Sequence, residues 1–218
     1  MYALDDYKKH FEDCQRSLSL AKKIMSREEV KLVKPSQVIK DFRGNLLRLF
    51  SSPEFYKICH QCKGLCCRTH NFPLRPIELL CFVAENPCFE FPEPDWQFLE
   101  KGEIVNGRRR FVDDPCLFLS EKGCILREYR PLTCLAFFEC FNQKIKQMYS
   151  EAEKEKIFYA QMSYCNMQIE TFCEEILRVL GISKKDKSYT EIKGEPTDGA
   201  VGFKACLEAL EKLAEPVN

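Results

Sequence analysis

The sequence lacks long apolar runs. Its longest purely apolar stretches reach about six residues, as in LLCFVA from Leu79, whereas a helix that crosses a bilayer needs roughly 20. The first residues, MYALDDYKKHFEDC, are charged from Asp5 onward and include neither the apolar core nor the small-residue cleavage site of a signal peptide. We therefore expect a cytoplasmic protein that does not enter a membrane.

An excess of one charge is also missing. The chain of 218 residues has 33 basic and 33 acidic residues, which argues against a general nucleic-acid binder, because such proteins carry a clear basic excess. The run Arg108–Arg110 is a local exception that fits either a charged edge strand or a site for an anionic substrate, an anionic cofactor or nucleic acid. Gly-rich dinucleotide, P-loop, HExxH and GxSxG motifs are absent, so none of these enzyme classes is indicated.

Cysteine, in contrast, is abundant, with 14 residues in the chain. Three kinds of structure use many thiols: a disulfide framework, a redox centre and a metal site. In the cytosol, clustered cysteines more often bind metals or carry out redox chemistry than form structural disulfides. The positions of the cysteines then separate those that fill a core from those that form clusters.

Apolar periodicity predicts helices in the first 85 residues or so. In residues 1–30 the apolar side chains recur at alternating spacings of three and four, which places them along one helix face. They are Leu4, Tyr7, Phe11, Cys14, Leu18, Ala21 and Met25. A second helix is expected after Ser36, whose side chain suits an N-cap. A short helix is expected over RPIELLCFVAEN, with Pro76 in its first turn.

Further along the chain, Asn106-Gly107 between two β-prone pieces predicts a two-residue hairpin. Residues 143–180 are predicted to be helical, with Gly181 as a helix stop. The polar residues that follow indicate a mobile loop, and a short helix is expected over about 203–214. One apolar face of the long helix should comprise Cys165, Ile169, Phe172, Cys173, Ile176, Leu177 and Leu180.

We therefore expect a mainly α fold, with helices packed around an irregular, cysteine-rich metal-binding centre that includes a small β-hairpin. An amino-terminal helical segment is expected over 1–52 and a cysteine-cluster core over 53–142. A long helix packed on this core is expected over 143–181, and a mobile loop with a short helix over 182–218.

Five cysteines are expected to play no part in metal binding, and for a sixth, Cys88, a role as a ligand is left open. Cys14, Cys165, Cys173 and Cys206 occupy apolar positions of helical patterns, where a free thiol packs as a small hydrophobic side chain. Cys81 lies in an apolar run, and Cys88 is assigned to the core or to a loop.

The other eight cysteines form two groups without helical or strand periodicity. The first group is C-x2-C-x3-C-C and the second lies within PCLFLSEKGCILREYRPLTCLAFFEC. A C-x2-C turn lets two thiolates converge on one ion, in zinc and iron–sulfur sites alike. Eight thiolates suffice for two four-coordinate sites or one polynuclear cluster, so zinc or iron is the expected cofactor. The candidate ligands are Cys59, Cys62, Cys66, Cys67, Cys116, Cys124, Cys134 and Cys140.

Neighbouring residues supply further candidates. Adjacent side chains point to opposite sides of an extended backbone, so Cys66 and Cys67 are expected to serve different ions. His60 and His70 are additional candidate ligands. Arg130 is a candidate for a cation beside the site, where it would offset the negative charge of the thiolates.

The ordered motifs CHQCKGLCC, PCLFL, GCILREYRP and LTC resemble those of the cysteine-cluster family described as a zinc- or iron-chelating domain. The resemblance extends over roughly residues 55–141 and implies metal binding, with the ion and the biochemical role open. Leu135 stands where the family has arginine, and Cys140 follows Cys134 at a longer spacing than usual. A flagellin lysine methylase is similar over the cysteine motif, which implies an alternative function as an iron–sulfur or iron-dependent modifying enzyme.

Overall fold

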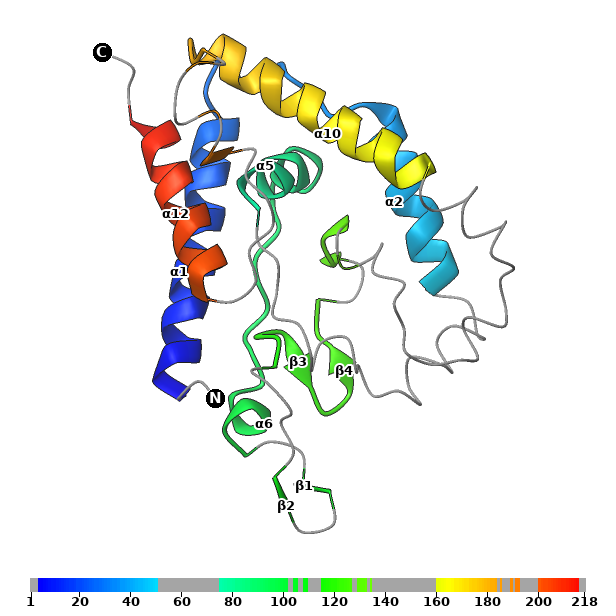
Figure 1. The fold of residues 1–218 in the computed structure, drawn as a ribbon, viewed down its shortest axis with the longest axis vertical. Helices are drawn as coiled ribbons and strands as arrows, with labels where there is room; N and C mark the ends of the chain where they lie inside the picture. The colour runs from blue at the N-terminus through cyan, green and yellow to red at the C-terminus, as the bar shows by residue number, and fades with distance from the viewer. Residues whose placement is uncertain are drawn as a thin grey trace. The chain divides into compact units, whose positions relative to one another are not determined.

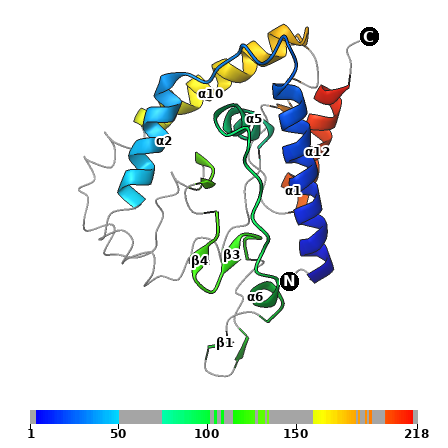
Figure 2. The same cartoon turned by 180° about the vertical axis from the view of Figure 1, so that it is seen from behind.

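The computed structural model describes residues 4–50, 75–101, 104–105, 108–109, 115–126, 129–132, 134, 160–183, 185, 189, 191–192 and 200–215. This part of the chain is mainly helical, as expected, and it contains six helices and two small antiparallel sheets (Figures 1 and 2). None of the described helices combines the length and the apolar character that a membrane-spanning helix requires.

The first helix, α1, extends over Leu4–Met25. The predicted apolar stripe is confirmed, because six of its seven members are buried. The helix ends at Met25, and the residues up to Leu32 form turns. Acidic residues in the first turn and lysines in the last turn complement the helix dipole.

Helix α2 extends over Gln37–Phe50 and buries Ile39, Phe42 and Leu46, which share one face at spacings of three and four. Ser36 directly precedes it, and its carbonyl accepts a hydrogen bond from the Ile39 amide. The predicted side-chain cap is wrong, because the buried Ser36 hydroxyl makes no hydrogen bond within the described part of the chain.

Helix α5 extends over Pro76–Glu85 and begins with Pro76 at its first turn, as predicted. Seven of its ten residues are buried, which explains why its sequence reads as an apolar run rather than as an amphipathic stripe. The ring of Phe82 on this helix and the rings of Phe89 and Phe91 beyond it form successive edge-to-face pairs, with centroids 4.8 and 5.2 Å apart.

A short helix that the sequence did not predict, α6, extends over Trp96–Lys101. The Asp95 side chain caps it by accepting a hydrogen bond from the Phe98 amide at 3.1 Å. Strands β1, Ile104–Val105, and β2, Arg108–Arg109, then pair antiparallel. Val105 pairs with Arg108, so two residues connect the strands, and the predicted two-residue hairpin is confirmed.

A second two-stranded sheet joins β3, Leu119–Ser120, to β4, Gly123–Cys124. Gly123 has a φ of +99°, a backbone conformation that suits glycine and is common where a short hairpin loop closes. Helix α6 packs against β3.

The long helix α10 extends over Ala160–Val179; the rest of the predicted helix, 143–159, lies outside the described residues. The expected apolar face is buried throughout. Gly181 ends the helix with a φ of +74°, and two amides close the last turn, Gly181 onto the Arg178 carbonyl and Ile182 onto the Leu177 carbonyl. This is the Schellman arrangement of a glycine-terminated helix.

Helix α12 extends over Ala200–Ala214 and buries Cys206, Leu207 and Leu210 as predicted. It packs against α5, and both views show it alongside α1. Residues before α12 contact two helices: Tyr189 donates a hydrogen bond to Glu174 of α10, and Glu191 pairs with Lys212 of α12.

The chain divides into two compact units that interleave in the sequence. Unit 1 comprises residues 1–11, 43–72 and 92–161, and unit 2 comprises the remaining residues. Both α1 and α2 contribute to both units. The predicted division of the chain, with a cysteine-cluster core over 53–142, stays a prediction, because much of that segment lies outside the described residues.

Candidate metal centre

Three of the eight predicted metal ligands lie in the described part of the chain, namely Cys116, Cys124 and Cys134. The other five lie outside the described residues, as do both candidate histidines. These are Cys59, Cys62, Cys66, Cys67, Cys140, His60 and His70. The structure therefore describes the candidate centre only through these three cysteines of the second group, all of which belong to unit 1.

Cys116 lies in a buried turn. Residues 115–120 are all buried, and the Cys116 side chain is 5% exposed. Its carbonyl accepts a hydrogen bond from the Leu119 amide at 2.9 Å, so the backbone turns at the cysteine before β3 begins. The thiol is consequently held in a fixed, largely dry position.

Cys124 lies on β4, directly opposite Leu119 of β3. The Ser120 hydroxyl stabilises the connection by donating to the Gly123 carbonyl at 2.8 Å and accepting from the Lys122 amide. Residues directly opposite on antiparallel strands have Cβ atoms about 5 Å apart. The hairpin therefore brings the half-buried Cys124 next to the turn that contains Cys116.

Cys134 is half-buried with helical backbone, and it follows a turn in which the Tyr129 amide donates to the Leu126 carbonyl. Arg130, the candidate cation, lies between Cys124 and Cys134 in the sequence. Its backbone carbonyl accepts a hydrogen bond from the guanidinium of Arg43 on α2, at 2.7 Å. This second arginine was not indicated by the sequence.

A complete metal site is not formed by these residues alone. Among the residues that the structure describes, no group of three or more His, Cys, Asp or Glu side chains is placed to hold an ion. The donor set nevertheless fits zinc or iron, because thiolates are the ligands that both metals take in structural and cluster sites. A site using Cys116, Cys124 and Cys134 needs ligands from the five candidates outside the described residues.

The cysteines expected to fill the core do so. Cys14, Cys81, Cys165, Cys173 and Cys206 are all buried, each at 4% exposure or less. None of the nine described cysteines forms a disulfide bond. Cys88 is exposed in a turn, so of its two predicted locations the loop is correct and the core is wrong.

Two of these core thiols have strongly raised pKa values. Burial, followed by the carboxylates of Glu78 and Glu85, raises the pKa of Cys165 to about 12. Burial also raises the pKa of Cys206 to about 12, although the neighbouring Ser17 hydroxyl acts in the opposite direction. Metals bind the thiolate form, so an ion at either residue would have to displace a tightly held proton, which disfavours both as ligands.

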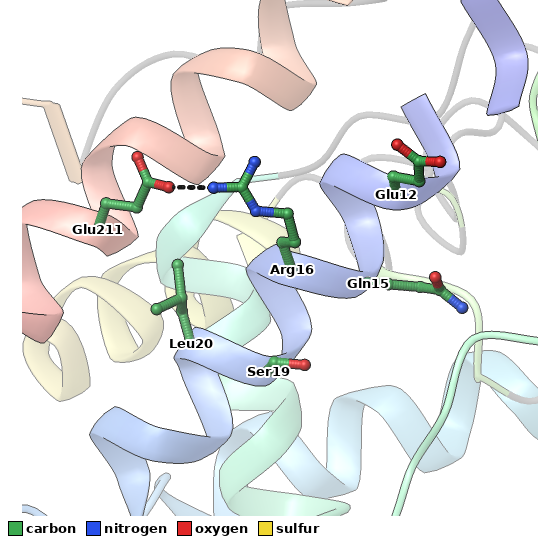
Figure 3. A pocket seen from close by; sticks show the side chains of 6 residues that line it. All are labelled: Glu12, Gln15, Arg16, Ser19, Leu20 and Glu211. Carbon is green, nitrogen blue, oxygen red and sulfur yellow. Dashed lines mark hydrogen bonds and ion pairs between the residues drawn. The ribbon is translucent and has the colours of Figure 1, made fainter. Parts of the chain in front are cut away.

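Two surface depressions in unit 2 contain no cysteine. One, of about 500 Å³, lies between α1 and α12 and is lined by Glu12, Gln15, Arg16, Ser19, Leu20 and Glu211. Figure 3 shows the Arg16 guanidinium and the Glu211 carboxylate pointing toward one another across it, 2.6 Å apart. The other, of about 550 Å³, lies between residues 29–36 and α10, with Leu32 and Phe172 in its lining. Neither depression offers the thiolate donors that the sequence predicts for the metal.

Comparisons of the chain with models of protein families, with curated proteins and with solved structures found no match. The resemblance to the cysteine-cluster family rests on the spacing of the cysteines and on the short motifs around them.

Proposed function

We propose that this chain is a metal-binding protein whose clustered cysteines hold zinc or iron as thiolates. The observation that supports the proposal is the division of the cysteines into two classes. Eight form two groups of four in segments without helical periodicity, whereas five are buried on the packed faces of helices.

Two of the core thiols are poor candidates for metal binding. Burial raises the pKa of Cys165 and of Cys206 to about 12, so an ion at either residue would have to displace a tightly held proton. Cys116 and Cys124 lie instead on a tight turn and on the short hairpin that directly follows it. Turns and short hairpins of this kind are common carriers of thiolate ligands in small metal sites.

The proposal assigns eight thiolates to the site, enough for two four-coordinate ions or for one polynuclear cluster. The metal would supply cross-links between segments that bury little apolar surface of their own, and its binding free energy would add to folding. Each four-thiolate site with a divalent ion carries a net charge near −2, so nearby arginines favour it electrostatically.

The proposal is tested by purifying the protein without oxygen, recording its visible spectrum and measuring its zinc and iron content. Zinc bound to thiolates is colourless, whereas iron–thiolate centres are brown, so the two measurements together also identify the ion. We expect zinc or iron in a fixed ratio to protein. A protein that contains neither metal, and takes up neither after reconstitution under reducing conditions, would contradict the proposal.

A further inference from the structure

Two side chains from the amino-terminal helices hydrogen-bond to the backbone of the cysteine-containing segments. The Tyr7 hydroxyl of α1 donates to the Pro115 carbonyl at 3.1 Å, and Arg43 of α2 donates to the Arg130 carbonyl at 2.7 Å. All four residues belong to unit 1. The partners are 108 and 87 residues apart in the sequence, so each bond joins the start of the chain to its cysteine-rich centre.

The first bond fixes the backbone beside Cys116. Tyr7 is only 2% exposed, and Pro115 is buried, so removing the hydroxyl would leave a buried carbonyl without this donor. Leaving such a group unsatisfied costs about 1–3 kcal/mol. On the other side of Cys116, the ring of Phe118 packs edge-on against Phe11 of the same helix, with centroids 6.5 Å apart. Helix α1 thus holds the chain both before and after Cys116.

The second bond fixes the backbone between Cys124 and Cys134. Arg130 lies six residues after Cys124 and four before Cys134, and its carbonyl is the acceptor for the half-buried Arg43. A hydrogen bond from a charged guanidinium is shorter and stronger than one between neutral groups. Arg43 also places a second positive charge next to Arg130, close to the segment that is expected to bind a metal through negatively charged sulfurs.

We propose that Tyr7 and Arg43 are positioning residues for the metal centre, an inference that rests on the function proposed above. They hold the Pro115 and Arg130 carbonyls, so the backbone beside Cys116 and between Cys124 and Cys134 needs little further ordering when an ion binds. A segment that is already ordered loses little conformational entropy on binding, which favours a higher affinity. Groups that hydrogen-bond to metal ligands themselves typically contribute 10–100-fold in affinity, and groups that act on the adjacent backbone are expected at the lower end of this range.

The test is a Co²⁺ titration of the reduced, metal-free, full-length chain, followed through its thiolate-to-cobalt absorption. Tyr7→Phe removes only the hydroxyl, and Arg43→Gln removes the charge and the fork of donors. We expect each variant to bind Co²⁺ about 10-fold more weakly, or worse, with the same number of ions at saturation. Arg43→Lys keeps a cation and a donor, so it should recover part of the loss.

Matched controls are available on the same types of residue. Arg48 on α2 bonds to Asn45 on the surface, and Tyr164 on α10 is half exposed. Arg48→Gln and Tyr164→Phe should therefore bind Co²⁺ as the unchanged chain does. Far-ultraviolet circular dichroism establishes that each variant is folded, and Arg43→Lys replaces Arg43→Gln in the comparison if the latter does not fold.

The outcomes separate this inference from the proposed function. If the unchanged chain binds Co²⁺ and the folded Tyr7 and Arg43 variants bind it equally tightly, the positioning role is wrong and the metal-binding function stands. If the unchanged chain binds neither Co²⁺ nor Zn²⁺ and takes up no iron on reconstitution under reducing conditions, both proposals are overturned.

Discussion

At the scale of single residues, the environment of each thiol decides what it can do. Cys165 is 1% exposed and lies near the carboxylates of Glu78 and Glu85, and these features together raise its pKa to about 12. Cys206 is equally buried and has a similar pKa for the same main reason, the loss of water around a thiolate. Both side chains therefore pack as small apolar groups over the whole physiological pH range.

These pKa values predict the reactivity of the thiols toward iodoacetamide, which attacks the thiolate form. Cys165 and Cys206 should resist alkylation in the folded protein at pH 8, whereas the exposed Cys88 should react. Labelling of the two buried residues should rise only as the pH approaches 12 or when the protein unfolds. Peptide mass spectrometry after timed labelling measures this, with labelling in urea as the control.

If either buried thiol were alkylated as fast as Cys88 at pH 8, the packed faces of α10 and α12 would be accessible to solvent. The division between core and ligand cysteines would then lose its physical basis.

At the scale of helices and strands, the sequence predicted an element correctly where a local pattern imposes one backbone conformation or one buried face. The glycine after α10 has the positive φ that a Schellman cap needs, and Asn-Gly marks a hairpin whose strands pair as expected. The stripe along α1 is buried because spacings of three and four place it on one face. Each of these features depends on residues within one or two turns of chain.

Other elements were missed because their local signals are weak. The hairpin of β3 and β4 closes with Ser-Glu-Lys-Gly, which lacks the Asn-Gly signal of the first hairpin, and its strands have two residues each. Helix α6 has six residues and follows a proline-rich stretch, so no periodicity was available. Ser36 precedes a helix in the expected place, yet its hydroxyl does not cap it, since burial and local geometry override the residue preference.

Two glycines offer a prediction at this scale. Gly181→Ala should destabilise the fold by roughly 1–2 kcal/mol, because a left-handed conformation is strained for a residue with a Cβ; the φ of Gly181 is +74°. Gly44→Ala should instead stabilise it by about 0.5–1 kcal/mol, because Gly44 lies within α2 and an added Cβ would contact nothing within 4 Å.

Urea unfolding of the two variants beside the unchanged chain measures both free energies under the same conditions. Equal effects of the two substitutions, in either direction, would contradict the assignment of Gly181 as the conformational stop of α10.

At the scale of the whole molecule, the contacts that organise the candidate centre join residues far apart in the sequence. Periodicity placed Tyr7 in an apolar stripe, but nothing near it indicates that its hydroxyl bonds to Pro115, 108 residues away. The same holds for Arg43 and the Arg130 carbonyl. Such pairs depend on the tertiary fold, which short sequence motifs do not specify. The candidate ligands, in contrast, can be proposed from the sequence alone, because a metal site of this kind requires several cysteines at short spacings, and their assignment stays a prediction.

The measurement that tests the central claim most directly is the number of zinc or iron ions bound per chain in matched cysteine variants. We predict that Cys124→Ser and Cys62→Ser each lower this number, because an alcohol is a poor substitute for a thiolate ligand. Cys173→Ala, at a residue that is fully buried in α10, should leave the number unchanged and cost only packing energy. Equal metal loss in all three variants, or none in any of them, would contradict the assignment of the clustered cysteines as the metal ligands.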